Sequence, residues 1–162
     1  MMSDRESAFV EEMGQVLGSY GMTPMAGRMW GWLLICDPPE QTAADLAEAL
    51  HASRGAISGT ARILSSAGMI RRTTRRGDRR EYFSAPPEAL DQFMSSAGQI
   101  YRQIRELMAR GLAAIADRPP EARARVQELH DLMAFIETEV PALLERYQRD
   151  RATRSGKKGA TR

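Results

Sequence analysis

Residues 42–84 read TAADLAEALHASRGAISGTARILSSAGMIRRTTRRGDRREYFS, and this stretch decides the fold of the 162-residue chain. Its first part has the spacing of a capping box, Thr42 followed by Asp45, which starts a helix and places an acid in its first turn. Apolar residues then recur at helical spacing as far as Leu50. The next two residues leave room only for a sharp turn, after which Ser53 is a suitable N-cap. The pattern predicts two helices joined by a tight turn.

The second of these helices has one apolar stripe and is followed by a hairpin. The stripe consists of Ile57, Ala61 and Leu64. The hairpin covers Met69–Ser84, where β-branched and aromatic residues suit paired strands and Gly77-Asp78 supplies the turn. We therefore predict a mainly α fold with a small β-hairpin, organised as a winged helix-turn-helix.

The outward face of the second helix carries groups that suit a nucleic acid. Arg54, Ser58 and Arg62 lie one turn apart, with Gly55 and Gly59 on the edge beside them. Arginine makes bidentate hydrogen bonds to guanine, and serine bonds to a base or a phosphate. A glycine inside a helix costs about 1 kcal/mol relative to alanine, so both glycines indicate close approach to another surface, such as DNA. Two alternatives stay open: Gly59 packs against another helix, or the arginines form an ordinary solvated face.

The hairpin that follows, which we call the wing (residues 69–84), is loaded with arginine. Its only acids are Asp78 and Glu81. Such a density of like charge is unfavourable without an anion nearby, and the phosphate backbone of a duplex is the natural candidate. A wing of this kind contacts the minor groove or the flanking phosphates. The alternative is a basic surface loop that binds nothing.

With these residues in view, the stretch from Gln41 to Phe83 resembles the MarR family of bacterial transcription factors. The resemblance is carried by Ser53–Ser58, Gly68–Arg71 and Gly77–Arg80. The family's wing has an Asp-x-Arg signature, so the resemblance implies that Arg80 reaches DNA and that Asp78 orients it.

Two segments nearer the N-terminus, Phe9–Gly14 and Thr23–Arg28, resemble the GbsR-like branch of that family. Members of the branch are dimeric repressors, and some respond to choline or related osmoprotectants. The resemblance therefore implies a dimeric repressor.

The residues expected to contact DNA come from the second helix and the wing. They are Ser53, Arg54, Gly55, Ser58, Gly59, Arg62, Arg71, Arg75, Arg76, Asp78, Arg79 and Arg80. The expected partner is double-stranded DNA with an inverted-repeat operator, bound by a homodimer.

Long helical stretches flank the DNA-binding module. After Pro86-Pro87, apolar residues alternate at intervals of three and four in two stretches separated by Pro119-Pro120. Heptad order of this length favours helix-on-helix packing across a two-fold axis, although an intramolecular hairpin alone would give the same pattern. The residues expected in the dimer contact are Phe9, Met13, Ile100, Ile104, Leu107, Val126, Leu129, Met133, Ile136 and Val140.

A small-molecule effector is a further expectation. The helix that starts at Thr23-Pro24 carries two tryptophans. The aromatic residues considered for an effector pocket, which would cage a quaternary ammonium compound, are Tyr20, Trp30, Trp32 and Tyr101. Ordinary core packing is the preferred interpretation of each of these residues taken singly.

We expect the chain to divide into four segments. Residues 1–37 form N-terminal helices that belong to the dimer arm and support the core, and residues 38–86 form the winged helix-turn-helix. Residues 87–149 form the C-terminal helical dimerisation region. Residues 150–162 are polar, basic and glycine-containing, and we expect a disordered tail.

Composition agrees with a small regulator located in the cytoplasm. The net charge is only +2, but acids outnumber bases before Leu50, and the arginines gather in the wing and near the C-terminus. The N-terminus lacks an apolar targeting core, and no apolar run approaches the length of a membrane span. The single cysteine, Cys36, forms no intrachain disulfide and is interpreted as a core residue rather than a redox sensor.

The sequence offers no enzyme chemistry of comparable specificity. His51 and His130 are isolated, and neither has metal-ligand spacing. No phosphate-binding glycine loop follows a strand, and neither a cofactor nor a metal is expected. We predict a dimeric, sequence-specific DNA-binding transcriptional regulator, a repressor that a small molecule releases. The alternative is a winged-helix module for protein–protein assembly that binds no specific DNA.

Overall fold

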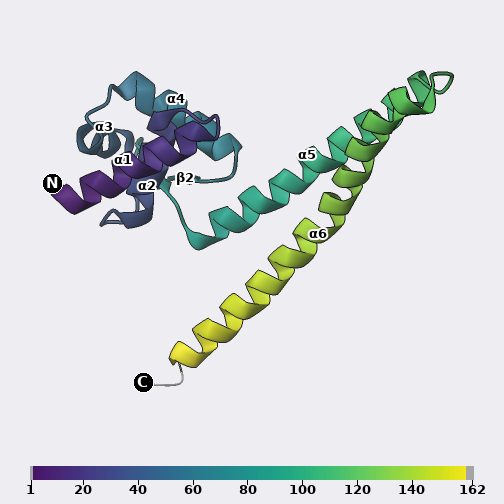
Figure 1. Ribbon diagram of the computed structural model, residues 1–162. Coiled ribbons are helices and arrows are strands. Elements are labelled where there is room, and N and C mark those ends of the chain that lie inside the picture. The colour runs from purple at the N-terminus through teal and green to yellow at the C-terminus, as the bar shows by residue number, and fades with distance from the viewer. Residues whose placement is uncertain (1, 160–162) are drawn as a thin grey trace. The chain divides into compact units, whose positions relative to one another are not determined.

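The computed structural model describes the backbone of residues 2–159 and the side chains of residues 2–89, 91, 94 and 98–154. The elements, shown in Figure 1, are α1 (Asp4–Ser19), α2 (Pro24–Ile35), β1 (Gln41–Thr42), α3 (Ala43–Ala49), α4 (Arg54–Ser66), β2 (Arg71–Thr74), β3 (Glu81–Ser84), α5 (Pro87–Ala114) and α6 (Pro120–Gly159). The chain forms two units, Met1–Phe93 and Met94–Arg162, and each makes most of its contacts internally. The predicted winged helix-turn-helix with long C-terminal helices is confirmed.

The helices of the first unit begin where the sequence places N-caps. Thr42 and Asp45 form a reciprocal capping box, in which the Asp45 amide donates to Thr42 Oγ1 and the Thr42 amide donates to Asp45 Oδ2. Ser53 caps α4 by accepting from the Ala56 amide, and Thr23 caps α2 one residue before Pro24. These caps set the direction of α3 and α4 and therefore the geometry of the helix-turn-helix.

The wing belongs to a three-stranded sheet with the order β1-β3-β2. β3 pairs with β2 in the register Arg71↔Ser84 to Thr74↔Glu81, and with β1 through Gln41↔Phe83 and Thr42↔Tyr82. Both pairings are antiparallel. The sequence predicts only the hairpin, because a strand of two residues shows no alternation of apolar and polar side chains. β1 matters because it ties the start of α3 to the base of the wing.

The core of the first unit lies where α1 to α4 meet β3. Its largest fully buried side chains are Met29, Leu46, Leu50, Ile57, Leu64 and Val10. Cys36 belongs to the same core, and burial raises the pKa of its thiol. The predicted structural role of Cys36 agrees with this position.

Close approach of α1 and α2 depends on glycine. A Cβ atom added at Gly27 would lie 2.5 Å from the Met13 carbonyl oxygen and 2.7 Å from Gly14 Cα. No side chain fits at that distance, so Gly27 lets the two helix backbones touch.

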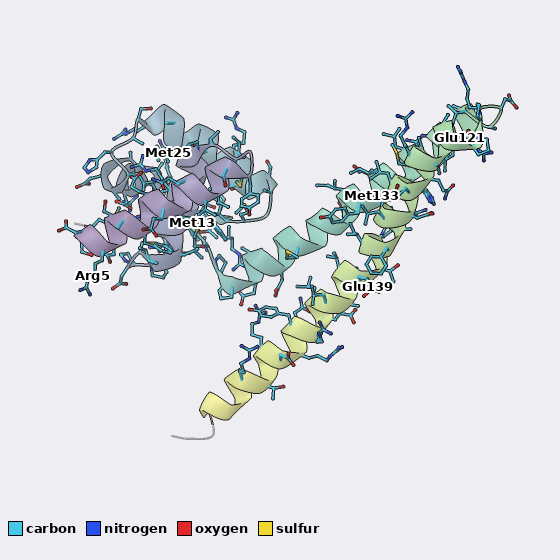
Figure 2. The ribbon with its side chains drawn as sticks, viewed as in Figure 1. Arg5, Met13, Met25, Glu121, Met133 and Glu139 are labelled. Carbon is cyan, nitrogen blue, oxygen red and sulfur yellow. The ribbon has the colours of Figure 1, made fainter. Side chains whose placement is uncertain are left out.

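The second unit consists of α5 from Met94 onward, α6 and the connection between them. Glu137 on α6 accepts from Arg102 Nε at 3.0 Å and from Arg105 Nε at 2.7 Å, both on α5. Met133, which Figure 2 labels on α6, is the only apolar side chain of this unit that is buried among those described. The exposed large apolar side chains of this unit are Ile100, Leu107, Leu129, Leu132, Phe135, Leu143 and Tyr147.

The expectation of a disordered tail from residue 150 is corrected, because α6 continues to Gly159 instead of ending near residue 149. Residues 150–155 contain no proline or glycine, so nothing in them stops the helix. This part of α6 also makes local contacts, since Thr153 Oγ1 donates to the Arg149 carbonyl and Arg151 lies over the Tyr147 ring. Residues 160–162 of the expected tail lie outside the described part. Among the helices described, none has the length and apolar character that crossing a bilayer requires.

Candidate nucleic-acid interface

The recognition helix α4 has a buried face and an open face. Ile57, Thr60, Ala61 and Leu64 are buried against the core of the first unit. The opposite face is exposed and carries the predicted side chains Arg54, Ser58 and Arg62, together with Gly55. Because these residues are polar or lack a side chain, and are exposed to solvent, this face of α4 is available to another molecule.

The two glycines on this face meet no other part of the protein. A Cβ at Gly59 would have no neighbour within 4 Å in the described chain, and a Cβ at Gly55 would meet only Ser53 Oγ at 4.0 Å. The alternative that Gly59 packs against another helix of the same chain is therefore wrong. Both glycines leave the helix backbone uncovered toward solvent, where a groove-shaped partner can approach closely.

An arginine behind the recognition helix holds the turn that precedes it. Arg28 Nη2 donates to the Leu50 carbonyl at 3.0 Å, and Arg28 Nε lies 2.8 Å from Glu11 Oε1 on α1. His51, the next residue after Leu50, has a φ of 49° and makes the sharp change of direction. The position of α4 is therefore coupled through Arg28 to both α1 and α2.

The turn of the wing presents its charged residues away from the sheet. The Asp78 amide donates to the Arg75 carbonyl at 3.0 Å, which closes a four-residue turn. Gly77 has a φ of 84° and occupies the third place of that turn, where a positive φ is needed. Arg75, Arg76, Arg79 and Arg80 are all exposed at or beside this tip.

Asp78 and Arg80 form the contact that the family resemblance implied. Asp78 accepts a hydrogen bond from the Arg80 amide at 2.9 Å and one from Arg80 Nη2 at 2.7 Å. Arg80 Nε lies 3.1 Å from Asp78 Oδ1 and 3.0 Å from Oδ2. Tyr82 adds a fourth donor, since its hydroxyl lies 2.7 Å from Asp78 Oδ2. The Arg80 hydrogen bonds, helped by the Tyr82 hydroxyl, hold the pKa of Asp78 far below its usual range. The same Asp78 contact raises the pKa of Tyr82.

The arginines of the interface fall into two groups. Arg72 is paired with Glu81 across the wing, Arg75 Nη2 lies 2.6 Å from Glu40 Oε2, and Arg80 Nη2 lies 2.7 Å from Asp78 Oδ2. The others have no ion pair or side-chain hydrogen bond within the described part of the chain, and they are Arg54, Arg62, Arg71, Arg76 and Arg79. Exposed guanidinium groups without a partner in the protein are what a polyphosphate partner requires.

The residues considered for an effector pocket do not come together in one unit. Trp30 and Trp32 are partly buried against the core of the first unit. Tyr20 caps the end of α1 and is 83% exposed, while Tyr101 belongs to the second unit. Neither unit alone therefore holds an aromatic cage of all four.

The expected dimer residues differ in their exposure. Phe9, Ile100, Leu107 and Leu129 are exposed, which suits a contact with a second chain. Met133 is buried, and Val126 lies beside Gly111, where an added Cβ would be 3.7 Å from Val126 Cγ1. These two residues already serve the packing of α5 against α6. Met13, Ile104, Ile136 and Val140 are half-buried.

Two residues that contact the arginines of the wing, Glu40 and Tyr82, were not predicted from the sequence. Glu40 was not considered because it lies outside the hairpin, more than thirty residues before Arg75. Tyr82 was read only as a strand residue, yet it contacts Asp78 and carries Arg75 over its ring. A tyrosine on a strand surrounded by arginines is a weak signal, because its ring suits a strand in any case.

Comparison with known proteins gives a consistent result. A family model described as MmpR5-like MarR family transcriptional regulator matches residues 88–150, and the MarR family model matches residues 33–82. The HTH-type transcriptional regulator MmpR5 of Mycobacterium tuberculosis (strain ATCC 25618 / H37Rv) is 42% identical over 139 residues, covering 86% of this chain and 84% of the relative. A crystal structure described as a transcriptional regulator matches with a TM-score of 0.83 and 40% identity, covering 90% of this chain and 99% of that one. The expected GbsR-like branch finds no support in these matches, which favour an MmpR5-like relationship.

Proposed function

Because the chain belongs to the MarR family of DNA-binding transcriptional regulators, which bind DNA as dimers and are not enzymes, we propose that it acts as a homodimeric repressor on an inverted-repeat operator. Each α4 enters a major groove, and the two copies lie about one duplex turn apart, roughly 34 Å. Each wing contacts the flanking phosphates or the minor groove. A regulator of this kind acts on chromosomal DNA, so we place it in the cytoplasm.

The observation that carries this proposal is the open surface of α4 and the wing. Arg54 and Arg62 are exposed beside two uncovered glycines, and neither arginine has an ion-pair partner in the described chain. We assign base contacts to Ser58 and Arg62, and phosphate contacts to Ser53 and Arg54 at the start of the helix. In the wing, the contacts are assigned to Arg71, Arg76, Arg79 and Arg80, with Asp78 orienting Arg80.

The dimer proposal is supported by the apolar side chains that the second unit leaves exposed. Leu129, Leu132 and Phe135 are 39%, 48% and 64% exposed on α6. A groove of ≈ 390 Å³ also opens between α5 and α6, lined on one side by Met94 and Gly98 and on the other by Val140 and Leu144. We propose that a second copy covers this surface, and that residues 87–149 form the dimerisation region while residues 1–86 support and form the DNA-binding module.

We also propose release by a small molecule bound beside α2. Trp32 Nε1 is a buried donor that has no acceptor in the described part of the chain, so a ligand acceptor would satisfy it. A ligand at Trp30 and Trp32 would shift the spacing of the two recognition helices. Quaternary ammonium compounds are the first class to test, in a thermal-shift assay with and without operator. If none of them changes the melting temperature, the effector proposal loses its chemistry while the DNA proposal stands.

The DNA proposal is tested by selecting bound fragments from the source genome and titrating the selected duplex at several salt concentrations. The observed affinity should fall steeply with salt, with a logarithmic slope of about −0.9 for each phosphate contacted. Arg62→Ala should weaken binding about tenfold or more and relax the base preference at one position. Arg5→Ala is the matched control, because Arg5 is exposed on α1 away from α4 and the wing (Figure 2). Binding that ignores salt and Arg62 would favour a protein–protein assembly module instead.

A further inference from the structure

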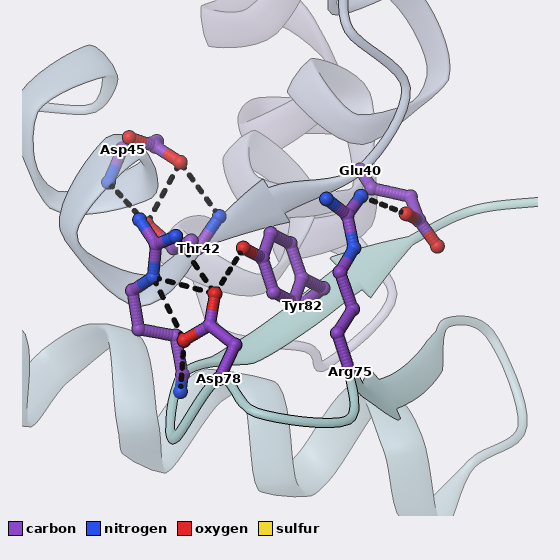
Figure 3. Close-up of polar contacts among 7 residues, drawn as sticks. Glu40, Thr42, Asp45, Arg75, Asp78 and Tyr82 are labelled. Atoms are coloured by element: carbon purple, nitrogen blue, oxygen red, sulfur yellow. Dashed lines mark hydrogen bonds and ion pairs between the residues drawn. The ribbon is translucent and has the colours of Figure 1, made fainter.

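The side chain of Tyr82 lies at the centre of the wing's polar contacts. Tyr82 is only 7% exposed, although it stands on β3 in the most highly charged part of the chain. Its ring has Arg75 Cζ at 4.0 Å from the centroid and Arg80 Cζ at 5.6 Å. Its hydroxyl donates to Asp78 Oδ2 at 2.7 Å (Figure 3). One side chain therefore contacts two arginines and the aspartate between them.

The hydroxyl of Tyr82 limits how the Asp78 carboxylate can rotate. A carboxylate accepts about four hydrogen bonds, and Asp78 receives those of the Arg80 amide, Arg80 Nε, Arg80 Nη2 and the Tyr82 hydroxyl. The Nε and Nη2 bonds move together with the Arg80 guanidinium, whereas the bond from the Arg80 amide fixes Oδ1 to the backbone. The Tyr82 bond comes from a buried ring on a paired strand and fixes the other oxygen, Oδ2.

The ring of Tyr82 is held from its other side. Arg75, which lies over the ring, has its Nη2 2.6 Å from Glu40 Oε2, and Thr73 Oγ1 lies 3.5 Å from Glu40 Oε1. Glu40 directly precedes β1, the strand that pairs with β3 at Tyr82. Arg75 therefore has partners within the protein, and although its side chain is partly exposed, it holds the ring of Tyr82 in place.

We propose that Tyr82 is a positioning residue for DNA binding, which holds Asp78 so that Arg80 is presented in one orientation, with Arg75 and Glu40 anchoring its ring. The inference rests on the proposed function in one respect, that Arg80 contacts DNA. It assigns Arg75 a role inside the protein, whereas sequence reasoning placed it among the DNA contacts. A preorganised guanidinium loses less freedom on binding than a mobile one, and this is where affinity is gained.

The test is a double-mutant cycle between Tyr82→Phe and Arg80→Ala, measured as affinity for the selected operator. Phenylalanine keeps the ring under Arg75 and removes only the hydroxyl. In the otherwise unchanged protein, Tyr82→Phe should weaken binding about fivefold, the size expected for one hydrogen bond to a charged group at a partly exposed site. In the Arg80→Ala background the same change should have no effect, because the orientation of Arg80 no longer matters.

Two further measurements separate positioning from a general loss of structure. The Arg80 Nε–H resonance of the free protein should exchange faster with water in Tyr82→Phe, which a merely structural role elsewhere would not cause. Tyr20→Phe is the matched control, since Tyr20 is 83% exposed at the end of α1, and it should leave both affinity and the resonance unchanged.

The results of these measurements separate the positioning role of Tyr82 from the DNA contact of Arg80 on which it rests. If Arg80→Ala leaves affinity and its salt slope unchanged, the wing contact in the proposed function is wrong and the role of Tyr82 falls with it. If Arg80→Ala weakens binding but Tyr82→Phe has no effect, or the same effect in both backgrounds, only the positioning role is overturned. A fivefold loss confined to the background that retains Arg80 supports it.

Discussion

The two units of the molecule differ in how much apolar surface they bury. In the first unit, large side chains such as Met29, Leu46 and Ile57 are fully buried in a common core, and exposed apolar side chains such as Val16 and Ile63 lie outside it. In the second, Met133 is the only buried apolar residue among the side chains described, while Leu107, Leu132 and Phe135 are about half exposed. The first unit has a core of its own, whereas the described part of the second leaves most of its large apolar side chains exposed. This difference supports the proposal that recognition and assembly belong to different parts of one chain.

The strongest way to break this comparison is to place a charge on the exposed apolar surface of α6. Leu132→Glu should prevent dimerisation, because an unpaired carboxylate in an apolar contact costs several kcal/mol. Operator affinity should fall by about a hundredfold or more, since each 1.4 kcal/mol is a factor of ten. Sedimentation analysis and operator titration measure the two effects.

Thr138→Glu is the control for that experiment, because Thr138 is an exposed polar residue of the same helix and is not one of its exposed apolar side chains. It should leave the dimer intact. A dimer that survives Leu132→Glu would show that this stripe is not the contact between subunits.

The next prediction tests whether the first unit depends on its own core. Leu46→Ala removes a fully buried side chain from α3 and should lower the free energy of unfolding by about 2–5 kcal/mol. Ile63→Ala, at a side chain that is 52% exposed on α4, should change it by no more than about 0.5 kcal/mol. Urea unfolding measures both, and equal losses would contradict the burial of Leu46.

A smaller effect separates the inner and outer surfaces of the first unit. Gly59→Ala should raise the free energy of unfolding by up to about 1 kcal/mol, because alanine favours the helix and the new methyl meets open space. The same change should weaken operator binding about tenfold, since the methyl would lie between α4 and the groove.

Gly27→Ala is the counterpart of that variant. Its methyl would meet the Met13 carbonyl at 2.5 Å, so the protein should become less stable. If Gly59→Ala bound operator as well as the unchanged protein, close approach at Gly59 would be ruled out.

The smallest predicted effect is a pH dependence that belongs to the wing. The pKa of Asp78 is lowered in the folded protein, mainly by Arg80, so the ionised carboxylate stabilises the fold at pH values above its ordinary 3.8. That stabilisation is lost as the pH falls below this value toward the folded pKa. Asp78→Asn should therefore reduce the loss of melting temperature between about pH 4 and pH 2.5. If the melting temperatures of the two proteins fell by the same amount over this pH range, the Asp78 carboxylate would not be the group that stabilises the fold.

Much of the fold could be predicted because its signals are local. The capping residues Thr42 and Ser53, the apolar stripe of α4 and Gly77 in the wing turn each act within a few residues of chain. The parts that could not be predicted depend on contacts distant in sequence. β1 is only two residues long, and Glu40 meets Arg75 across a separation of 35.

The candidate site divides in the same way. Arg62 and Ser58 were identified because helical spacing fixes which side chains share a face. The difference between paired Arg75 and unpaired Arg76 was invisible, since neighbouring arginines in a turn look equivalent until the fold supplies partners. The end of α6 was misjudged because basic composition was taken to mean disorder, although arginine and alanine are good helix formers.

The distribution of indole side chains gives the two units different optical properties. Both tryptophans of the chain, Trp30 and Trp32, stand on α2. Their fluorescence, excited selectively over that of tyrosine, therefore reports events in the N-terminal unit, and the C-terminal helices, whose aromatic residues include Tyr101 and Tyr147 but no tryptophan, do not contribute to it. Replacing Phe135 with tryptophan in a chain whose own two are changed to phenylalanine would supply the missing signal, and the unfolding of each part could then be followed separately.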